Sequence, residues 1–386
     1  MIPYGDALYF AVVLYPVAAT ILLGLAGRLS RWWILAVSVA VAIAQYSGVV
    51  WMAHAIAIPT LCIVATYGLA QWLVAAGFLR VRHLGTLPFY AAVALATGPL
   101  LLSRALPLVS QAPAAFLGLS YATFRSVDVL VCIHDGLIAS LSPVTYLAYL
   151  FFFPTWSAGP IDRYRRFEAD SRRRRGRAEF LVDLDAAVRR FFDGLLYKFV
   201  LAAFVQQFGL SPLATHHGFF ATWAYMYAYS FYLFFDFAGY SSFAIAFSYL
   251  LGVHTPENFN RPFFATNMMD FWNRWHITLS AWFRDHVYMR FVMAAVRGRW
   301  VASRQAVSCL GFFVTFGLMG LWHGFAARYI VYGLYHASLL SLTVWLVEYR
   351  KGRRIWGEGP LWTAAATAVT FNLVSFGFLI FSGRLG

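Results

Sequence analysis

The sequence predicts an all-α protein that crosses a membrane several times. Of its 386 residues, 61% are hydrophobic and only 12% are charged, and its mean hydropathy is +0.65. A soluble domain carries roughly 25% charged residues. The chain also contains many apolar runs near the ~20 residues that a helix needs to span a bilayer. These runs are continuously apolar and do not alternate, which disfavours a transmembrane β-barrel.

The apolar runs divide the chain into predicted helices. The run 114–124 is short for a span, and Asp236 lies in the middle of the run 218–252. The polar, tryptophan-rich segment 253–285 interrupts the pattern, and we expect it to be re-entrant or interfacial on the cytoplasmic side. No internal repeat or linker is evident, so residues 1–386 are predicted to form a single membrane domain. The runs lie at about 7–27, 32–50, 55–79, 86–103, 114–124, 127–141, 144–158, 188–208, 218–252, 306–327, 329–347 and 361–382.

The net charge of +14 comes mostly from arginines between the apolar runs. This placement indicates the positive-inside rule and contact with anionic lipid, and it gives no reason to expect nucleic acid. We therefore expect the basic residues at 28–31, 80–82 and 350–354 to be cytoplasmic and both termini to lie outside. The first basic residue, Arg28, follows the first apolar run, so residues 1–27 are predicted to be a retained helix.

The densest basic stretch is PIDRYRRFEADSRRRRGRAEF, residues 160–180. One interpretation is a topology anchor on anionic lipid. The other is a docking surface for an acidic protein at the cytoplasmic face, with Arg163, Arg165 and Arg166 as candidates.

The chain shows no signature of metal, disulfide or acyl-enzyme chemistry. Cys62, Cys132 and Cys309 lie in apolar runs without metal or redox spacing, as is typical of small buried side chains. Neither a CxxC, an HExxH, a serine nucleophile elbow nor a phosphate-cradling glycine loop occurs. We therefore predict no metal and no permanently bound cofactor.

The stretch FWNRWHITLSAWFRD, residues 271–285, gathers scarce polar side chains around one histidine. If it is one helix, Asn273, His276 and Ser280 share a face. Trp275 and Trp282 lie on another face, with Leu279. Such a helix either anchors at the membrane surface or presents polar groups to a cavity.

A second histidine, His323, stands in GLMGLWHGF, residues 317–325, near the end of an apolar run. An ionisable group within a membrane span is costly and usually faces a cavity. The flanking Gly320 and Gly324 would permit close approach of backbone or substrate. Histidine titrates near neutral pH, so two such histidines indicate proton handling, although a structural role for either remains open.

The motifs DFWNRWH (270–276) and GLWHG (320–324) together resemble the membrane-bound O-acyltransferase family. Further segments, from about residue 117 to the C-terminus, are similar to the branch of that family that transfers D-alanine. They are LGLSYATFRSVD (117–128), FFFPTWSAGPIDRYRRF (151–167), YSFYLFFDFAGYSSFAIAFSYLLG (229–252), TPENFNRPFFATN (255–267), WFRDHVYMRF (282–291) and FGFLIFSGRL (376–385).

The resemblance implies a ring of transmembrane helices around a central funnel or tunnel, with re-entrant helices, in the cytoplasmic membrane. It implies transfer of D-alanine from the phosphopantetheine thioester of an acidic carrier protein to an envelope hydroxyl such as that of a teichoic acid. An extracytoplasmic partner protein is often involved. His323 would be the catalytic histidine and His276 the second family histidine. The residues that would shape the tunnel are Asn273, Arg274, Trp275, Ser280 and Trp322.

Two other functions stay open at this stage. A sister branch of the family O-acetylates exported polysaccharides such as alginate or cellulose and shares both histidine motifs. A transporter or proton channel could instead use His276 and His323 as a relay, although no inverted repeat supports it.

Overall fold

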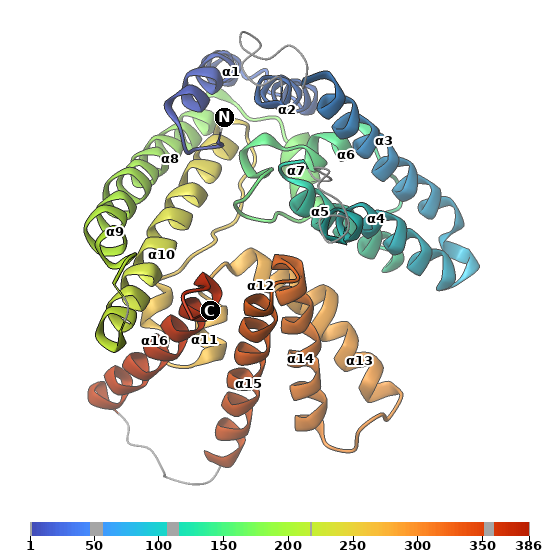
Figure 1. The fold of residues 1–386 in the computed structure, drawn as a ribbon. Coiled ribbons are helices and arrows are strands. Elements are labelled where there is room, and N and C mark those ends of the chain that lie inside the picture. The colour runs from blue at the N-terminus through green and yellow to red at the C-terminus, as the bar shows by residue number, and fades with distance from the viewer. Residues whose placement is uncertain (1, 47–56, 106–115, 217, 351–358, 386) are drawn as a thin grey trace. The chain divides into compact units, whose positions relative to one another are not determined.

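The computed structural model describes residues 2–46, 57–105, 116–216, 218–350 and 359–385, and these residues are predominantly helical (Figure 1). Within them the only strand-like pairing is a single bridge between Phe259 and Trp275. The all-α prediction is therefore confirmed. Lys351, Arg353 and Arg354 of the predicted cytoplasmic loop lie outside the described residues. So do parts of the predicted runs 32–50, 55–79 and 114–124.

Among the described residues, eight helices are long and apolar enough to cross a membrane. This confirms a polytopic membrane protein, because length and apolar composition together are what a bilayer requires of a helix. The ring, the tunnel and the re-entrant helices stay predictions. The eight helices are Ala7–Leu25, Thr60–Leu84, Leu87–Ala105, Arg177–Leu213, Phe219–Leu250, Arg304–His323, Ala327–Arg350 and Pro360–Ser382.

The chain divides into two compact units, of which the first comprises Met1–Gly194 and Tyr240–Pro256. It includes the C-terminal part of the long helix α10, and α3 packs beside α4 and α5. Its helices are α1 (Ala7–Leu25), α2 (Arg31–Tyr46), α3 (Ala57–Val81), α4 (Leu87–Ala105), α5 (Leu119–His134), α6 (Pro143–Leu150), α7 (Tyr164–Arg172) and α8 (Arg177–Leu195), with 3-10 turns at Arg82–Leu84 and Phe153–Thr155.

Three predicted apolar runs of this unit form something other than separate spans. The run 144–158 contains only the short helix α6 before the chain turns at Phe153–Thr155, which includes Pro154. Parts of the runs 114–124 and 127–141 join in α5, whose interior is buried. The reason is that α5 carries Arg125 and Asp128, which are 1% exposed and bond to surrounding protein. These segments are apolar because they form the protein core.

The second unit comprises Leu195–Gly239 and Glu257–Gly386. The helix that begins as α8 continues into this unit through two π-helical segments, Leu196–Ala202 and Val205–Leu210. A π-helical segment adds a residue to a turn and is frequent at functional sites. The remaining helices are α9 (Ser211–Leu213), α10 (Phe219–Leu250), α11 (Met268–Trp272), α12 (Ile277–Phe283), α13 (Met289–Arg297), α14 (Arg304–His323), α15 (Ala327–Arg350) and α16 (Pro360–Ser382), with a 3-10 turn at Pro262–Phe264 and a π segment at Arg284–Tyr288.

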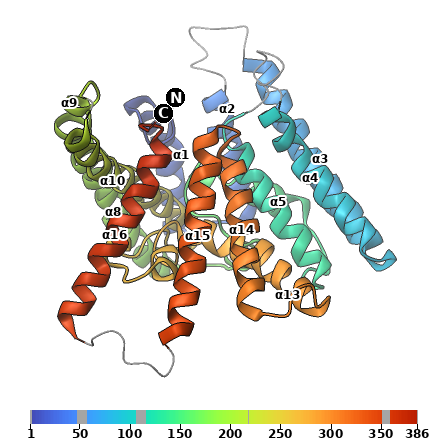
Figure 2. The same ribbon diagram turned by 60° about the horizontal axis from the view of Figure 1, so that its bottom comes forward.

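Helices α14 and α15 form a tight hairpin in the second unit (Figure 2). Glycine makes this approach possible: a Cβ at Gly320 would lie 2.5 Å from the carbonyl oxygen of Tyr329, and one at Gly333 would lie 2.3 Å from that of Phe316. Backbone atoms cannot yield as a flexible side chain does, so no larger residue fits at either position. The hairpin therefore fixes the C-terminal end of α14, where His323 lies.

Candidate functional site

His276 lies between two short helices, and the prediction of one continuous helix over 271–285 is wrong. Helix α11 ends at Trp272, and α12 begins at Ile277. His276 caps α12 with a φ of 43° and a ψ of 52°, in the left-handed region that residues other than glycine rarely occupy. Asn273 and His276 consequently share no face: Asn273 is exposed, whereas His276 is only 7% exposed.

A neighbouring segment of the chain causes this break. The loop 258–260 runs antiparallel to residues 274–277, so that the N–H of Asn260 donates to the carbonyl of Arg274 and the N–H of Ile277 donates to the carbonyl of Asn258. These bonds replace the helical hydrogen bonds that the turn at His276 would otherwise make. The predicted apolar face is nevertheless buried, since Trp275, Leu279 and Trp282 are at most 6% exposed.

The side chain of Asn258 determines which nitrogen of His276 carries the proton. Oδ1 of Asn258 lies 3.1 Å from His276 Nδ1 and accepts from the Thr278 hydroxyl at 2.8 Å and from the Thr278 N–H at 3.4 Å. A backbone N–H can only donate, so the Asn258 atom is the oxygen and His276 Nδ1 must donate to it. Neutral His276 therefore carries its proton on Nδ1 and keeps the lone pair on Nε2.

His276 is neutral at physiological pH. Burial lowers the pKa of its imidazole to about 3, and a positive charge on His323 acts in the same direction. The two histidines of the second unit are thus within electrostatic reach of each other. Phe237 of α10 packs edge-on against the His276 ring, with ring centroids 4.7 Å apart. Neutral His276 can accept a hydrogen bond through Nε2 but has no proton to spare as an acid.

His323 is the last residue of α14 and is held among aromatic rings. Its ring centroid lies 4.4 Å from that of Trp322 and 4.9 Å from that of Phe381 on α16. Tyr329 and Tyr332 of α15 lie at 5.8 and 6.5 Å. The C-terminal end of a helix carries partial negative charge, which stabilises an imidazolium formed there. His323 is half-buried at this end of α14.

The other residues predicted to shape a tunnel lie in the same unit but differ in burial. Trp275 is buried among rings that include Phe378 at 4.8 Å. The Ser280 hydroxyl donates to the Trp275 carbonyl at 3.2 Å. Arg274 pairs with Asp270 at 2.7 Å, and Trp322 is half-buried beside His323. No group of three metal-ligating side chains occurs in the part of the chain that the structure describes.

The candidate docking arginines belong to the first unit, and two of the three are ion-paired. Arg163 contacts Asp128 at 2.9 Å and Arg166 contacts Asp162 at 2.5 Å, and both carboxylates are 2% exposed. Arg165 is exposed. Arg163 and Arg166 thus hold the start of α7 in place, while the exposed charge of this stretch lies on Arg165, Arg172, Arg173, Arg174 and Arg177.

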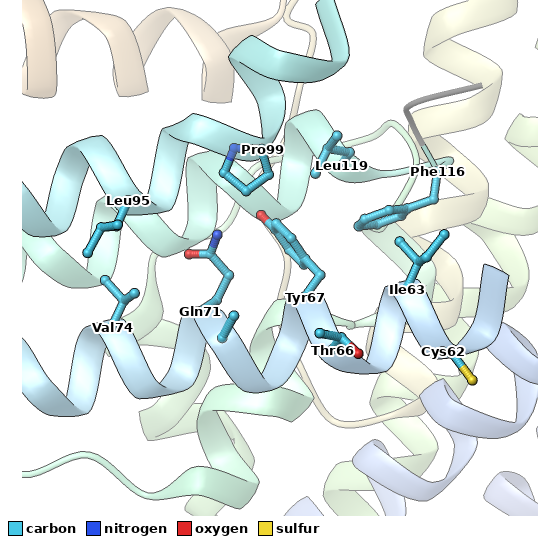
Figure 3. Close-up of a pocket in the computed structure, with 11 residues that line it drawn as sticks. Cys62, Ile63, Thr66, Tyr67, Gln71, Val74, Leu95, Pro99, Phe116 and Leu119 are labelled. Carbon is cyan, nitrogen blue, oxygen red and sulfur yellow. The ribbon is translucent and has the colours of Figure 1, made fainter. Parts of the chain in front are cut away.

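A cavity of about 450 Å³ in the first unit contains none of the predicted site residues (Figure 3). Gln71 and Tyr67 of α3 and Pro99 of α4 lie along it. The amide nitrogen of Gln71 donates to the carbonyl of Ala96 at 3.0 Å. The lining is otherwise mostly apolar, so this cavity is unsuited to proton transfer.

Sequence reasoning missed two polar contacts of the second unit. In the sequence, Asn258 stands within a segment that resembles the family, and nothing local indicates that it holds His276. Asp236 of α10 was noticed within an apolar run, but its partner, Lys198 in the first π-helical segment, lies in another helix. An apolar run with a single carboxylate is a signal that a cation must come from elsewhere.

The described fold and site are those of a polytopic helical membrane protein with two histidines in one unit. A model of the membrane-bound O-acyltransferase family matches residues 133–378, which include both histidines. The teichoic acid D-alanyltransferase of Bacillus subtilis is 39% identical over 100% of this chain and 98% of its own length. The teichoic acid D-alanyltransferase of Streptococcus thermophilus is 40% identical over 77% of this chain and 76% of its own length. The probable alginate O-acetylase AlgI of Pseudomonas syringae is 31% identical over 69% of this chain and 48% of its own.

The chain therefore belongs to the membrane-bound O-acyltransferase family. It is an acyltransferase and a multi-pass protein of the cell membrane. The resemblance that the two histidine motifs carry is confirmed at the level of the family.

Proposed function

We propose that this enzyme transfers D-alanine from the phosphopantetheine thioester of an acidic carrier protein to a hydroxyl of an envelope polymer of the teichoic acid type. The observation that carries the proposal is the 39% identity, over the whole chain, to a protein named teichoic acid D-alanyltransferase. The carrier would meet the exposed arginines of the 160–180 stretch at the cytoplasmic face. An extracytoplasmic partner protein would relay the acyl group where the acceptor is distant.

In the proposed reaction His323 is the general base. The acceptor oxygen attacks the thioester carbonyl while His323 takes the hydroxyl proton. The carbon–sulfur bond then breaks, and the departing thiolate takes the proton from His323. The helix end around His323 favours the transient imidazolium. His276, neutral and with Nε2 as its acceptor, would hold a hydrogen-bond donor of the substrate or an ordered water on the approach to His323.

The test compares the wild type with His323→Ala in the native host, at matched protein levels. Washed envelopes are treated with mild base, and released D-alanine and acetate are measured. We expect D-alanine to be released from wild-type envelopes and to vanish in the variant. If neither product depends on His323, the acyl-transfer proposal is wrong, and proton or solute flux through the two variants becomes the next measurement.

O-acetyl transfer to an exported polysaccharide is the second candidate. The 31% identity to a probable alginate O-acetylase over 69% of this chain favours it, and that match includes less than half of the relative's length. The same experiment separates the candidates, because acetate in place of D-alanine would then be the ester lost in His323→Ala.

A further inference from the structure

Transfer of D-alanine, on which this inference rests, poses an electrostatic problem that transfer of acetate does not. The α-amino group of a D-alanyl thioester is largely protonated near neutral pH, so the acyl group carries a positive charge into a site of low dielectric. An unpaired ammonium in such a site is strongly disfavoured. The unit that holds the two histidines should therefore offer a carboxylate.

Few carboxylates of this unit lie within its membrane-spanning helices. Outside those helices, Asp270 pairs with Arg274 and Asp285 pairs with Arg284. The candidate spans of the second unit contain, within their described parts, two acidic residues: Asp236 of α10 and Glu348 of α15. Glu348 is exposed and lies two residues before α15 ends at Arg350. Asp236 lies well inside α10, and the next residue, Phe237, contacts the ring of His276 at 4.7 Å. Of these two carboxylates, Asp236 is the one on the helix that packs against the ring of His276.

Asp236 is ion-paired but only partly covered by protein. Its Oδ1 accepts from the ammonium of Lys198, which is 14% exposed and stands in a π-helical segment. The side chain of Asp236 is 36% exposed, and among the described residues its ion pair is made through Oδ1 with Lys198. An exposed carboxylate oxygen on a membrane-spanning helix faces a polar interior or water, because contact with lipid would be too costly. A carboxylate can accept from two ammonium groups at once.

We propose that Asp236 binds the α-ammonium of the D-alanyl group through Oδ2, while Lys198 holds Oδ1 and fixes the orientation of the carboxylate. Asp236 then determines specificity for an aminoacyl donor over a simple acyl donor. The proton that His323 takes comes from the acceptor hydroxyl, so Asp236 has no part in bond making.

The experiment compares two donors that differ only in the ammonium: the carrier protein's phosphopantetheine loaded with D-alanyl or with propionyl. Inside-out membrane vesicles expose the cytoplasmic face, and incorporation of labelled acyl group into base-labile ester gives kcat/KM for each donor. For Asp236→Asn we expect a loss of about 10- to 100-fold with D-alanyl, the range for a hydrogen bond to a charged group, and less than a twofold change with propionyl.

Controls separate recognition from folding. Asp236→Asn leaves Lys198 without its partner, which can destabilise the helix pair. The double variant Lys198→Met, Asp236→Asn removes both charges and should show the same selective loss. Asp236→Glu keeps the carboxylate and should retain a preference for D-alanyl. Glu348→Gln, which removes the other carboxylate, should leave both rates unchanged.

Each outcome decides one question. A wild type that uses both donors equally, or an Asp236→Asn variant that loses both equally, overturns ammonium recognition but leaves D-alanyl transfer intact. A wild type that transfers neither donor contradicts the proposed function itself. If the wild type transfers D-alanyl only, the two rates cannot be compared. Binding is then measured in their place, with the non-reactive pantetheine amides of D-alanine and of propionate as ligands. Selective loss of D-alanyl amide binding in Asp236→Asn then supports the proposal, and equal binding overturns it.

Discussion

The two histidines of the second unit are positioned by different means. His276 is held by hydrogen bonds from a loop: Asn258 fixes its tautomer, and the bridge between Phe259 and Trp275 holds its backbone. His323 is held by packing: a helix end, a glycine-lined hairpin and the rings of Trp322 and Phe381. A hydrogen bond to one nitrogen fixes the tautomer of an imidazole, whereas packing against rings fixes the position and orientation of the imidazole. In the proposed reaction the base is His323, and the rings around it hold it at the end of α14.

This contrast predicts that loss of His323 costs more activity than loss of His276. Asparagine is the replacement of choice because it tolerates the left-handed backbone at position 276. We expect His323→Asn to lower kcat by about 10²- to 10⁴-fold, the range for a general base. His276→Asn should lower it by less, about tenfold, as for one lost hydrogen bond. Acyl transfer in membrane vesicles measures both. Equal losses would mean that both histidines act as bases.

Packing behind His323 can be tested through the α14–α15 hairpin. Gly320→Ala places a Cβ 2.5 Å from the carbonyl oxygen of Tyr329, so the helices must separate. We expect destabilisation of about 1–3 kcal/mol, the usual cost of overpacking, together with reduced activity. Gly317→Ala in the same helix is the matched control, because nothing lies within 4 Å of its added Cβ. Thermal unfolding in detergent should separate the two variants, and equal stability would show that the hairpin does not constrain α14.

The different ways in which the two histidines are held also explain how much of the fold and the site the sequence could predict. The spans and His323 follow from local composition, because a helix and its apolar run are encoded by consecutive residues. The break at His276 could not be predicted, because the residues that cause it are Asn258 and Asn260 of a distant loop. The α6 run was mistaken for a span because a protein core and a bilayer select the same apolar side chains. Lys198 and Asp236, likewise, are 38 residues apart and meet only in the fold.

The hydrogen bonds around His276 can be broken one partner at a time. Asn258→Ala removes the acceptor of His276 Nδ1 and of Thr278, and each buried donor left without a partner costs about 1–3 kcal/mol. We expect lower stability and several-fold lower activity. Asn258→Asp keeps an acceptor and should preserve more of both. Asn260→Ala is the control, since Asn260 is exposed and its hydrogen bond to the Arg274 carbonyl comes from the backbone N–H. Unfolding midpoints and kcat of the three variants provide the measurement.

The smallest expected effect is on the pH dependence of stability. The pKa of buried His276 is lowered to about 3, whereas a solvated histidine titrates near 6.5. Below pH ~6.5 the unfolded chain binds a proton that the folded chain does not, so this residue's contribution to stability is lost as pH falls towards 3. Between pH 6.5 and pH 5 the free energy of unfolding falls by at most about 2 kcal/mol through this residue.

Replacing His276 with a residue that does not titrate should remove this contribution. The unfolding midpoint of His276→Gln should therefore fall less between pH 7 and pH 5 than that of the wild type. His83→Gln is the matched control, because it also replaces one histidine with glutamine but at an exposed position. Identical pH profiles for the wild type and His276→Gln would mean that the folded protein accommodates a protonated His276. That result would remove the contrast between the two histidines, because both rings could then carry the proton of the reaction.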